Sequence, residues 1–318
     1  MASFPSLLES IGDLETNQIE VLLSRSKHFK NNPQLSPFSQ TFPKPCIATS
    51  FLENSTRTKH SFAVAIQRLG GNYIDFNAES SSLKKGESLE ETFLTLFHQG
   101  VNLCVFRTSV SHQMQEFKQH LPIKLVNGGD GVNEHPSQAL LDLLTLLELE
   151  SDIDGKTISI IGDIVHSRVA HSLMKLLPLF GLKIILNGPD EYLPKSDSLP
   201  RGVSILKDRD EAIAKSDFLY LLRIQKERHE NNGEDTLNSY VAKYGVTLEL
   251  LKKLNKLIPV LHPGPANIGV ELDQALIKSS LYKGYLQVEN SIPMRMAIIE
   301  AMLLNNDQNI GKINGEKF

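Results

Sequence analysis

The stretch KPCIATSF at residues 44–51, followed by STRTKHSFAVAIQRLGG at residues 55–71, sets a pattern that the rest of the chain repeats. The first part is a short apolar run, which is typical of a buried strand. The second part carries apolar residues at helical spacing, namely Phe62, Ala65, Ile66 and Leu69. This spacing predicts a helix that ends at the Gly70-Gly71 pair. A strand that leads directly into a helix begins a βαβ unit.

Further short apolar runs predict strands along the whole chain. They are NYIDF (72–76), VNLCVF (101–106), IKLVN (123–127), KTISIIGD (156–163), LKIILNG (182–188), DFLYLLR (217–223) and LIPVLHPG (257–264). Helical patterns lie between many of them, at 88–100 with Ser88 as N-cap, at 135–150 and at 166–177. This alternation predicts an α/β protein with two parallel-sheet domains, helices on both faces of each sheet, and a break near residues 147–155.

Composition narrows the class of protein. The 318 residues include 33 basic and 37 acidic side chains, for a formal net charge of −4. A mildly acidic chain lacks the basic surface that nucleic acids require, so we expect no nucleic-acid partner. The N-terminus does not resemble a signal peptide, and no apolar run reaches the roughly 18 residues that span a bilayer. Cys46 and Cys104 lie in apolar runs and are expected to be buried thiols. We expect a soluble cytoplasmic protein.

Charged and polar side chains gather in the loops that follow the predicted strands. In the first such loop, Ser55, Thr56, Arg57 and Thr58 meet the start of a helix. Free N–H groups, hydroxyls and a guanidinium together suit a phosphate. The alternative is an ordinary capped helix with a solvated Arg57.

The other candidate residues lie in six further loops and are Lys85, Arg107, His135 with Gln138, Arg168, Arg223 with Arg228, and the His262–Pro265 turn. Taken singly, each could be a surface charge or a structural turn. Together they place many cations where a parallel-sheet fold brings loops to one edge. Dinucleotide-binding G-x-G-x-x-G and ATP-binding P-loop motifs are absent from the sequence. The pattern indicates a site for at least one phosphate and one or two carboxylates, and indicates no metal.

The order of these motifs resembles that of aspartate carbamoyltransferase catalytic chains, from about residue 4 to about residue 304. The motifs are Ser55–Thr58, Lys84–Glu87, His135–Ala139, Gly162-Asp163 with His166–Arg168, Leu222–Gln225 and His262–Pro265. S-T-R-T with H-P-x-Q marks the carbamoyltransferase superfamily, and the lysine loop and the Arg-x-Gln segment are typical of the aspartate branch. Ornithine carbamoyltransferases are expected to carry a Ser-Met-Gly loop and a His-Cys-Leu-Pro turn, which this sequence lacks.

The resemblance implies a fold, a reaction and an assembly. It implies a carbamoyl phosphate-binding domain at 1–147, an aspartate-binding domain at 148–289, and a C-terminal helix region at 290–318 that returns to the first domain. The reaction joins carbamoyl phosphate to L-aspartate in pyrimidine synthesis, without metal or organic cofactor. The chains are expected to form a homotrimer with active sites shared between neighbours. Whether regulatory chains or a dihydroorotase also bind the trimer stays open.

The resemblance also assigns roles to individual residues. The phosphate is expected to be held by Ser55, Thr56, Arg57, Thr58 and Arg107. The carbamoyl oxygen is expected to be polarised by Thr58, Arg107 and His135, and the carbamoyl amine to be bound by Gln138 and the carbonyl groups of Gly264 and Pro265. The aspartate is expected to be held by Arg168, Arg223, Gln225 and Lys85. Lys85, with Ser81, is expected to come from the adjacent subunit, and Glu53 and Arg228 to pair between domains in the closed state.

Two alternative functions remain at the level of sequence. One is an ornithine carbamoyltransferase or a relative that uses another amine. The other is an inactive homologue that serves as a structural or regulatory subunit. The second alternative predicts erosion of S-T-R-T, the lysine loop or H-P-x-Q, and all three motifs are intact.

Overall fold

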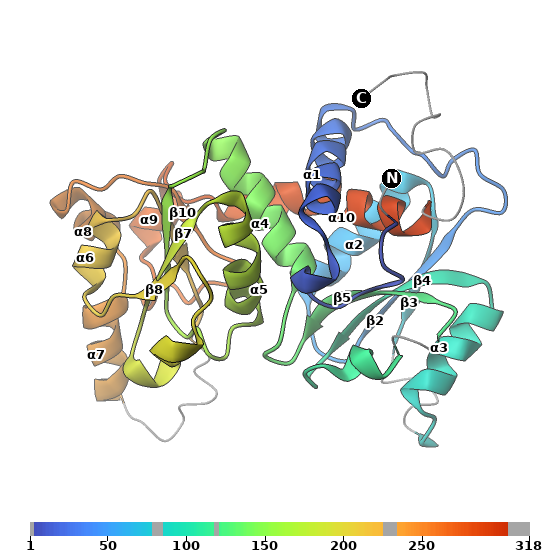
Figure 1. Ribbon diagram of the computed structural model, residues 1–318, viewed down its shortest axis with the longest axis horizontal. Helices are drawn as coiled ribbons and strands as arrows, with labels where there is room; N and C mark the ends of the chain where they lie inside the picture. The colour runs from blue at the N-terminus through green and yellow to red at the C-terminus, as the bar shows by residue number, and fades with distance from the viewer. Residues whose placement is uncertain (1–2, 78–84, 118–120, 225–233, 305–318) are drawn as a thin grey trace. The chain divides into compact units, whose positions relative to one another are not determined.

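The computed structural model describes residues 3–77, 85–117, 121–224 and 234–304 (Figure 1). The chain divides into two compact units, which are Met1–Leu141 with Glu289–Phe318 (unit 1) and Asp142–Val288 (unit 2). In the described residues each unit contains one five-stranded sheet, and every strand pair in the two sheets is parallel. The predicted α/β fold with two parallel-sheet domains is therefore confirmed.

The sheet of unit 1 has the order β1-β5-β4-β2-β3. Its strands are β1 (Leu7–Leu8), β2 (Cys46–Phe51), β3 (Asn72–Phe76), β4 (Val101–Thr108) and β5 (Lys124–Asp130). Because β5, β4 and β2 are neighbours, the loops that follow them leave the sheet side by side. These loops carry most of the residues that the sequence predicts for the phosphate and the carbamoyl group.

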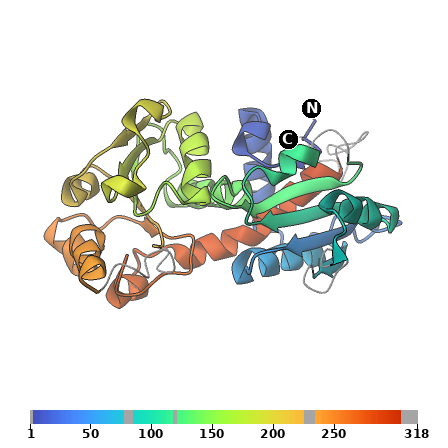
Figure 2. The same ribbon diagram turned by 90° about the horizontal axis from the view of Figure 1, so that it is seen from below.

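Helices cover both faces of this sheet (Figures 1 and 2). They are α1 (Thr16–Asn31), α2 (Thr56–Leu69), α3 (Leu89–His98), the start of α4 (Pro136–Leu149) and the end of α10 (Gly284–Leu303). On one face, Arg295 of α10 packs over the Phe62 ring of α2, and Glu300 pairs with Arg25 of α1 at 2.5 Å. On the other face, Phe93 of α3 meets Phe106 of β4 edge to face, with 5.2 Å between ring centroids.

Helix α2 follows the sequence prediction closely. It begins at Thr56 directly after Ser55 and ends at Leu69, where Gly70 takes a left-handed conformation with a φ of 80°. The predicted apolar face is fully buried and consists of Phe62, Ala65, Ile66 and Leu69. The start of this helix is therefore fixed against the sheet by a packed core.

The sheet of unit 2 has the order β10-β9-β6-β7-β8. Its strands are β6 (Thr157–Ile161), β7 (Lys183–Asn187), β8 (Val203–Ile205), β9 (Phe218–Leu221) and β10 (Val260–Leu261). Its helices are α5 (Arg168–Leu176), α6 (Arg209–Ala214), α7 (Glu234–Tyr244), α8 (Leu248–Lys253) and α9 (Gln274–Lys278). A buried apolar cluster joins the sheet to the segments around α6, α8 and α9, through Leu219, Ile213, Leu251 and Leu276.

Three predicted boundaries differ from the observed ones. Helix α5 begins at Arg168, two residues later than predicted, because the Ser167 side chain accepts a hydrogen bond from the Ala170 N–H and caps the helix there. Strand β10 is only Val260–Leu261, and α10 begins at Gly284 with Pro293 inside the helix, rather than near residue 290. In both places tertiary packing overrides the local sequence preference.

The two cysteines differ in environment. Cys104 is fully buried in β4, as predicted, whereas Cys46 is only partly buried because it is the first residue of β2. Both are free thiols. Burial raises the pKa of the Cys104 thiol to about 12 and also raises the pKa of Cys46. Among the described helices, none is both long enough and apolar enough to cross a lipid bilayer.

Candidate functional site

Thr58, Arg107 and His135 come from three different segments of unit 1, all at one edge of its sheet. Thr58 lies in the first turn of α2, Arg107 lies near the end of β4, and His135 directly precedes α4. The Oγ1 atom of Thr58 and the Nε2 atom of His135 are 3.3 Å apart, and both residues are buried. The structure thus brings together Thr58 and His135, which the sequence separates by 77 positions.

Arg107 is held at this edge by its main chain and its side chain. Its carbonyl oxygen accepts a hydrogen bond from the Leu52 N–H at 2.9 Å, which ties β4 to the loop after β2. Its Nε atom donates to Oε2 of Glu53 at 3.2 Å, and a terminal nitrogen donates to the Gly128 carbonyl at 3.4 Å. The guanidinium is therefore oriented by a carboxylate and a carbonyl before any ligand binds.

A buried polar network supports the loop that carries His135. The Asp130 carboxylate accepts hydrogen bonds from the N–H of Glu134 and from the Asn127 side chain. Glu134 in turn accepts from the Ile11 N–H at 3.0 Å and from the Ser10 hydroxyl. These contacts tie Glu134, the residue directly before His135, to the segments 10–11 and 127–130. The sequence pattern does not predict this network, because it depends on contacts between residues far apart in the chain.

The start of α2 has the features of an anion site. Ser55 occupies the N-cap position, yet its side chain makes no capping hydrogen bond. The first-turn N–H groups of a helix have no partner within the helix, and the helix dipole makes this end positive. Thr56 and Arg57 are exposed here, and Thr58 is buried beside His135. Hydroxyl groups, N–H groups and a cation therefore converge on one surface of unit 1.

Gln138 and Lys85 occupy different settings. Gln138 lies in the first turn of α4, which begins at Pro136 as predicted, and it is half-buried. Lys85 is exposed in the segment before α3. Ser81 lies outside the described residues.

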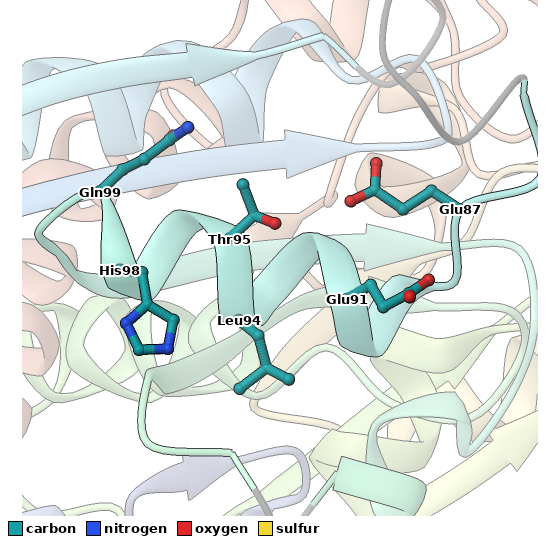
Figure 3. Close-up of a pocket in the computed structure, with 6 residues that line it drawn as sticks. All are labelled: Glu87, Glu91, Leu94, Thr95, His98 and Gln99. Atoms are coloured by element: carbon teal, nitrogen blue, oxygen red, sulfur yellow. The ribbon is translucent and has the colours of Figure 1, made fainter.

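A surface hollow of about 550 Å³ lies along α3 and contains none of the predicted site residues. Figure 3 shows Glu87 just before the helix and the other lining side chains on successive turns of α3. The lining residues are Glu87, Glu91, Leu94, Thr95, His98 and Gln99. Two carboxylates disfavour an anionic ligand in this hollow, so it is a poor match for the predicted chemistry.

In unit 2 the predicted residues also gather at one edge of the sheet. Arg168 is the first residue of α5 and follows β6, and Arg223 follows β9, the strand beside β6. The two loops lie close together: a Cβ atom added to Gly162 would be only 3.0 Å from the Leu222 carbonyl oxygen. Arg168 and Arg223 are both half-buried. Two guanidinium groups on adjacent loops suit a ligand with two carboxylates.

The loop after β6 is held by contacts of its own. Asp163 is buried, and its carboxylate lies 2.8 Å from Nδ1 of His166. The N–H groups of Ile164 and Val165 both donate to the Tyr192 carbonyl at 3.1 Å. The start of α5, and with it Arg168, is therefore fixed relative to the sheet.

The turn after β10 lies beside the loop that carries Arg223. Gly264 is half-buried and Pro265 is exposed. The Asn267 side chain donates to the Ile224 carbonyl at 3.0 Å, which joins this turn to the residue after Arg223. Gln225 and Arg228 lie outside the described residues. In the described part of the chain, no three His, Cys, Asp or Glu side chains cluster as a metal site would require.

Two family models match the chain. Residues 7–148 match the carbamoyl-P binding domain of aspartate/ornithine carbamoyltransferase, and residues 154–302 match the Asp/Orn binding domain of the same family. The aspartate carbamoyltransferase catalytic subunit of Listeria monocytogenes is 40% identical over 296 residues, which cover 93% of this chain and 95% of that relative.

Solved structures show the same fold. The aspartate transcarbamoylase of Trypanosoma cruzi in complex with carbamoyl phosphate is 31% identical with a TM-score of 0.81, covering 94% of this chain and 96% of that one. The ornithine carbamoyltransferase of Pyrococcus furiosus has a TM-score of 0.83 at 23% identity, covering 95% of this chain and 98% of that one. The second likeness concerns the fold alone.

Proposed function

Because the chain belongs to the aspartate/ornithine carbamoyltransferase family, we propose that it transfers the carbamoyl group of carbamoyl phosphate to the α-amine of L-aspartate. The products are N-carbamoyl-L-aspartate and phosphate, in de novo pyrimidine (UMP) biosynthesis. The observation that carries this proposal is the likeness to aspartate enzymes along nearly the whole chain. The chemistry of the described side chains supports it independently.

The charges in unit 2 favour aspartate over ornithine. Aspartate carries two carboxylates, and the loops after β6 and β9 each supply a guanidinium, from Arg168 and Arg223. In our proposal Arg168 binds the α-carboxylate, and Arg223 with Gln225 binds the β-carboxylate. The ammonium group of ornithine in place of the β-carboxylate would be repelled by Arg223.

In unit 1 the start of α2 is the proposed phosphate site. Ser55, Thr56, Arg57 and Thr58 supply main-chain N–H groups, hydroxyls and a cation to the phosphate oxygens. Arg107 assists, with its guanidinium already oriented by Glu53. Residues 1–147 would then form the carbamoyl phosphate-binding domain, residues 148–289 the aspartate-binding domain, and residues 290–318 the C-terminal region that returns to the first.

The transfer step follows from where negative charge develops. The aspartate amine attacks the carbonyl carbon, a C–N bond forms, and the C–O bond to phosphate breaks as the departing phosphate takes up the amine proton. Negative charge builds on the carbamoyl oxygen, and Thr58, Arg107 and His135 donate hydrogen bonds to it. Gln138 and the carbonyl groups of Gly264 and Pro265 bind the carbamoyl amine.

The active assembly in our proposal is a cytoplasmic homotrimer with shared active sites. Lys85 supplies a cation to the aspartate from the neighbouring subunit. Its exposure in the segment before α3 leaves it accessible to a second chain. Regulatory chains or a dihydroorotase could bind the same trimer.

An amine-substrate panel tests the proposed function. The purified protein is incubated with carbamoyl-labelled carbamoyl phosphate and either L-aspartate or L-ornithine, and its native mass is measured. We expect labelled N-carbamoyl-L-aspartate and a trimer mass. Labelled citrulline instead would assign the chain to the ornithine branch, and no transfer to either amine would contradict both assignments.

A further inference from the structure

A buried carboxylate in unit 2 connects two loops to which the proposed function gives different substrate groups. The Glu271 side chain is 2% exposed, and the His262 side chain is fully buried beside it. The Oε1 atom of Glu271 lies 3.3 Å from Nε2 of His262 and accepts a hydrogen bond from the Asn267 N–H at 2.5 Å. One oxygen atom therefore holds both ends of the turn that contains Gly264 and Pro265.

The hydrogen bonds of His262 define its tautomer. The Gly264 N–H donates to Nδ1 of the imidazole at 2.8 Å, so Nδ1 carries no proton. The ring proton is then on Nε2, from which it is donated to Glu271. Glu271 thus orients the His262 ring, and the ring in turn holds the main chain at Gly264, whose carbonyl is assigned to the carbamoyl amine.

The other end of this chain of contacts reaches the aspartate side of the proposed site. Asn267 receives its position from Glu271 through its main-chain N–H, and its side chain donates to the Ile224 carbonyl at 3.0 Å. Ile224 directly follows Arg223, which is assigned to the β-carboxylate of aspartate. Only two intervening residues, Asn267 and His262, separate Glu271 from the two assigned segments.

The start of this turn is also held by hydrogen bonds that run through Gln287 of α10 to Asp142 of α4. The His262 N–H donates to Oε1 of Gln287 at 2.8 Å, and Nε2 of Gln287 donates to Asp142 at 2.7 Å. The second carboxylate oxygen of Asp142 accepts from the Tyr220 hydroxyl at 2.7 Å. These contacts fix the His262 backbone independently of Glu271. Loss of Glu271 would therefore release the ring and Asn267, while the start of the turn stays in place.

We propose that Glu271 is a positioning residue that sets the spacing between the Gly264–Pro265 turn and the Arg223 segment. This inference rests on the proposed function for the roles of Gly264 and Arg223. Burying a carboxylate is costly unless hydrogen bonds compensate. Burial is the main cause that raises the pKa of the Tyr240 hydroxyl, and the nearby Glu271 side chain raises it further. Because the hydrogen bonds of Glu271 are directed to two loops, its effect on the reaction is exerted through the geometry of those loops.

Four variants separate positioning from stability. Glu271→Ala removes the acceptor for both loops, Glu271→Gln keeps one oxygen in the same place, and Asn267→Ala cuts only the link to Ile224. Glu249→Ala, at an exposed glutamate in the first turn of α8, is the matched control.

We expect Glu271→Ala to raise the KM for aspartate and lower kcat, each by about 10-fold, because the donors of Asn267 and His262 lose their buried acceptor. Glu271→Gln should recover to within about 3-fold of wild type, since its amide oxygen can accept the same two hydrogen bonds. Asn267→Ala should raise the KM for aspartate with a smaller effect on kcat. The Kd for inorganic phosphate should be unchanged in all variants, because the proposed phosphate site lies in unit 1.

Amide hydrogen exchange tests the positioning role of Glu271 without an activity assay. Glu271→Ala should speed exchange in segments 262–267 and 219–224, and Glu271→Gln should not. Asn267→Ala should speed exchange in segment 219–224 only. This variant tests the positioning role even if Glu271→Ala does not fold. Unchanged exchange and unchanged aspartate KM in Asn267→Ala and in a folded Glu271→Ala would overturn the proposal. If wild-type protein transfers no carbamoyl group, the proposed function fails, and exchange alone still tests the positioning role.

Discussion

At the residue scale, the contact between Thr58 and His135 is the clearest sign of chemistry in unit 1. Two polar side chains from distant segments are buried with their polar atoms 3.3 Å apart, and Arg107, which pairs with Glu53, lies at the same edge of the sheet. Buried polar groups are costly unless they are hydrogen-bonded, and clusters of them are common at functional sites. This placement supports the proposed role of Thr58, Arg107 and His135 as hydrogen-bond donors to the carbamoyl oxygen.

We expect His135→Ala and Arg107→Ala each to lower kcat by about 100- to 1,000-fold, because each removes a proposed donor to the developing charge. Steady-state transfer of labelled carbamoyl groups measures the loss, and thermal unfolding shows whether the fold persists. His28→Ala on α1 and Arg68→Ala on α2 are matched controls that should retain wild-type rates. Wild-type turnover in either site variant would remove the role given to that residue.

A second prediction at this scale concerns the buried thiol of Cys104. Burial raises its pKa from 9.0 to about 12, so at pH 8 only about one molecule in 10⁴ carries the thiolate. A thiol reagent at pH 8 should therefore modify Cys104 only after unfolding. In the unfolded chain the thiol ionises from about pH 9, whereas the folded chain keeps it neutral up to about pH 12.

The unfolding free energy should accordingly fall as the pH rises from about 9, by about 1.4 kcal/mol for each pH unit until the folded thiol also ionises. Denaturant unfolding at pH 8, 9 and 10 measures this slope. Cys104→Ala should show a shallower slope, and Tyr240, whose pKa is also raised by burial, contributes equally to both proteins. Equal slopes in the two proteins would show that Cys104 ionises alike when folded and unfolded.

At the element scale, the position of α2 depends on how it ends. Gly70 has a φ of 80°, and an added Cβ would lie 2.6 Å from the Ser36 hydroxyl and 2.8 Å from the Ser39 nitrogen. Gly100 has a φ of 91° with nothing within 4 Å of such a Cβ. We expect Gly100→Ala to cost about 1 kcal/mol from backbone strain alone, and Gly70→Ala about 3 kcal/mol because overpacking is added. Chemical denaturation of both variants checks the difference, and equal costs would exclude the steric contribution.

The helices and strands also differ in how well sequence patterns predict them. The strand and helix at 44–71 and the N-cap at Ser88 depend on neighbouring residues, and both were predicted. The start of α10 at Gly284 and the two-residue β10 depend on packing against distant segments, and both differ from prediction. Local patterns specify elements well, whereas their ends are set by tertiary contacts.

In the candidate site, too, some features follow from sequence patterns and others depend on contacts between distant segments. Strand-end loops predicted which residues gather within each unit, because parallel strands bring their carboxyl ends together. The pairs Arg107–Glu53 and His262–Glu271 were not predicted, since they depend on side-chain geometry between separate loops. The set of charged residues in strand-end loops predicts a site, whereas the structure shows which side chains orient them.

At the scale of the whole molecule, the proposed sharing of active sites between subunits makes a specific prediction. Lys85→Ala and Arg57→Ala should each give inactive trimers, because one removes the residue supplied to the neighbour and the other removes the phosphate site. After subunit exchange, mixed trimers should regain activity, since some sites then combine an intact Lys85 with an intact Arg57. Mass spectrometry of intact trimers verifies the exchange. No recovery in verified mixed trimers would contradict shared sites.

The most direct test of carbamoyl transfer to aspartate is the stoichiometry of a single turnover. Protein loaded with carbamoyl-labelled carbamoyl phosphate is mixed with L-aspartate, and labelled N-carbamoyl-L-aspartate and free phosphate are measured together. We predict that the two products form at the same rate and in equal amounts. Phosphate released without labelled N-carbamoyl-L-aspartate would show that the protein does not perform this transfer.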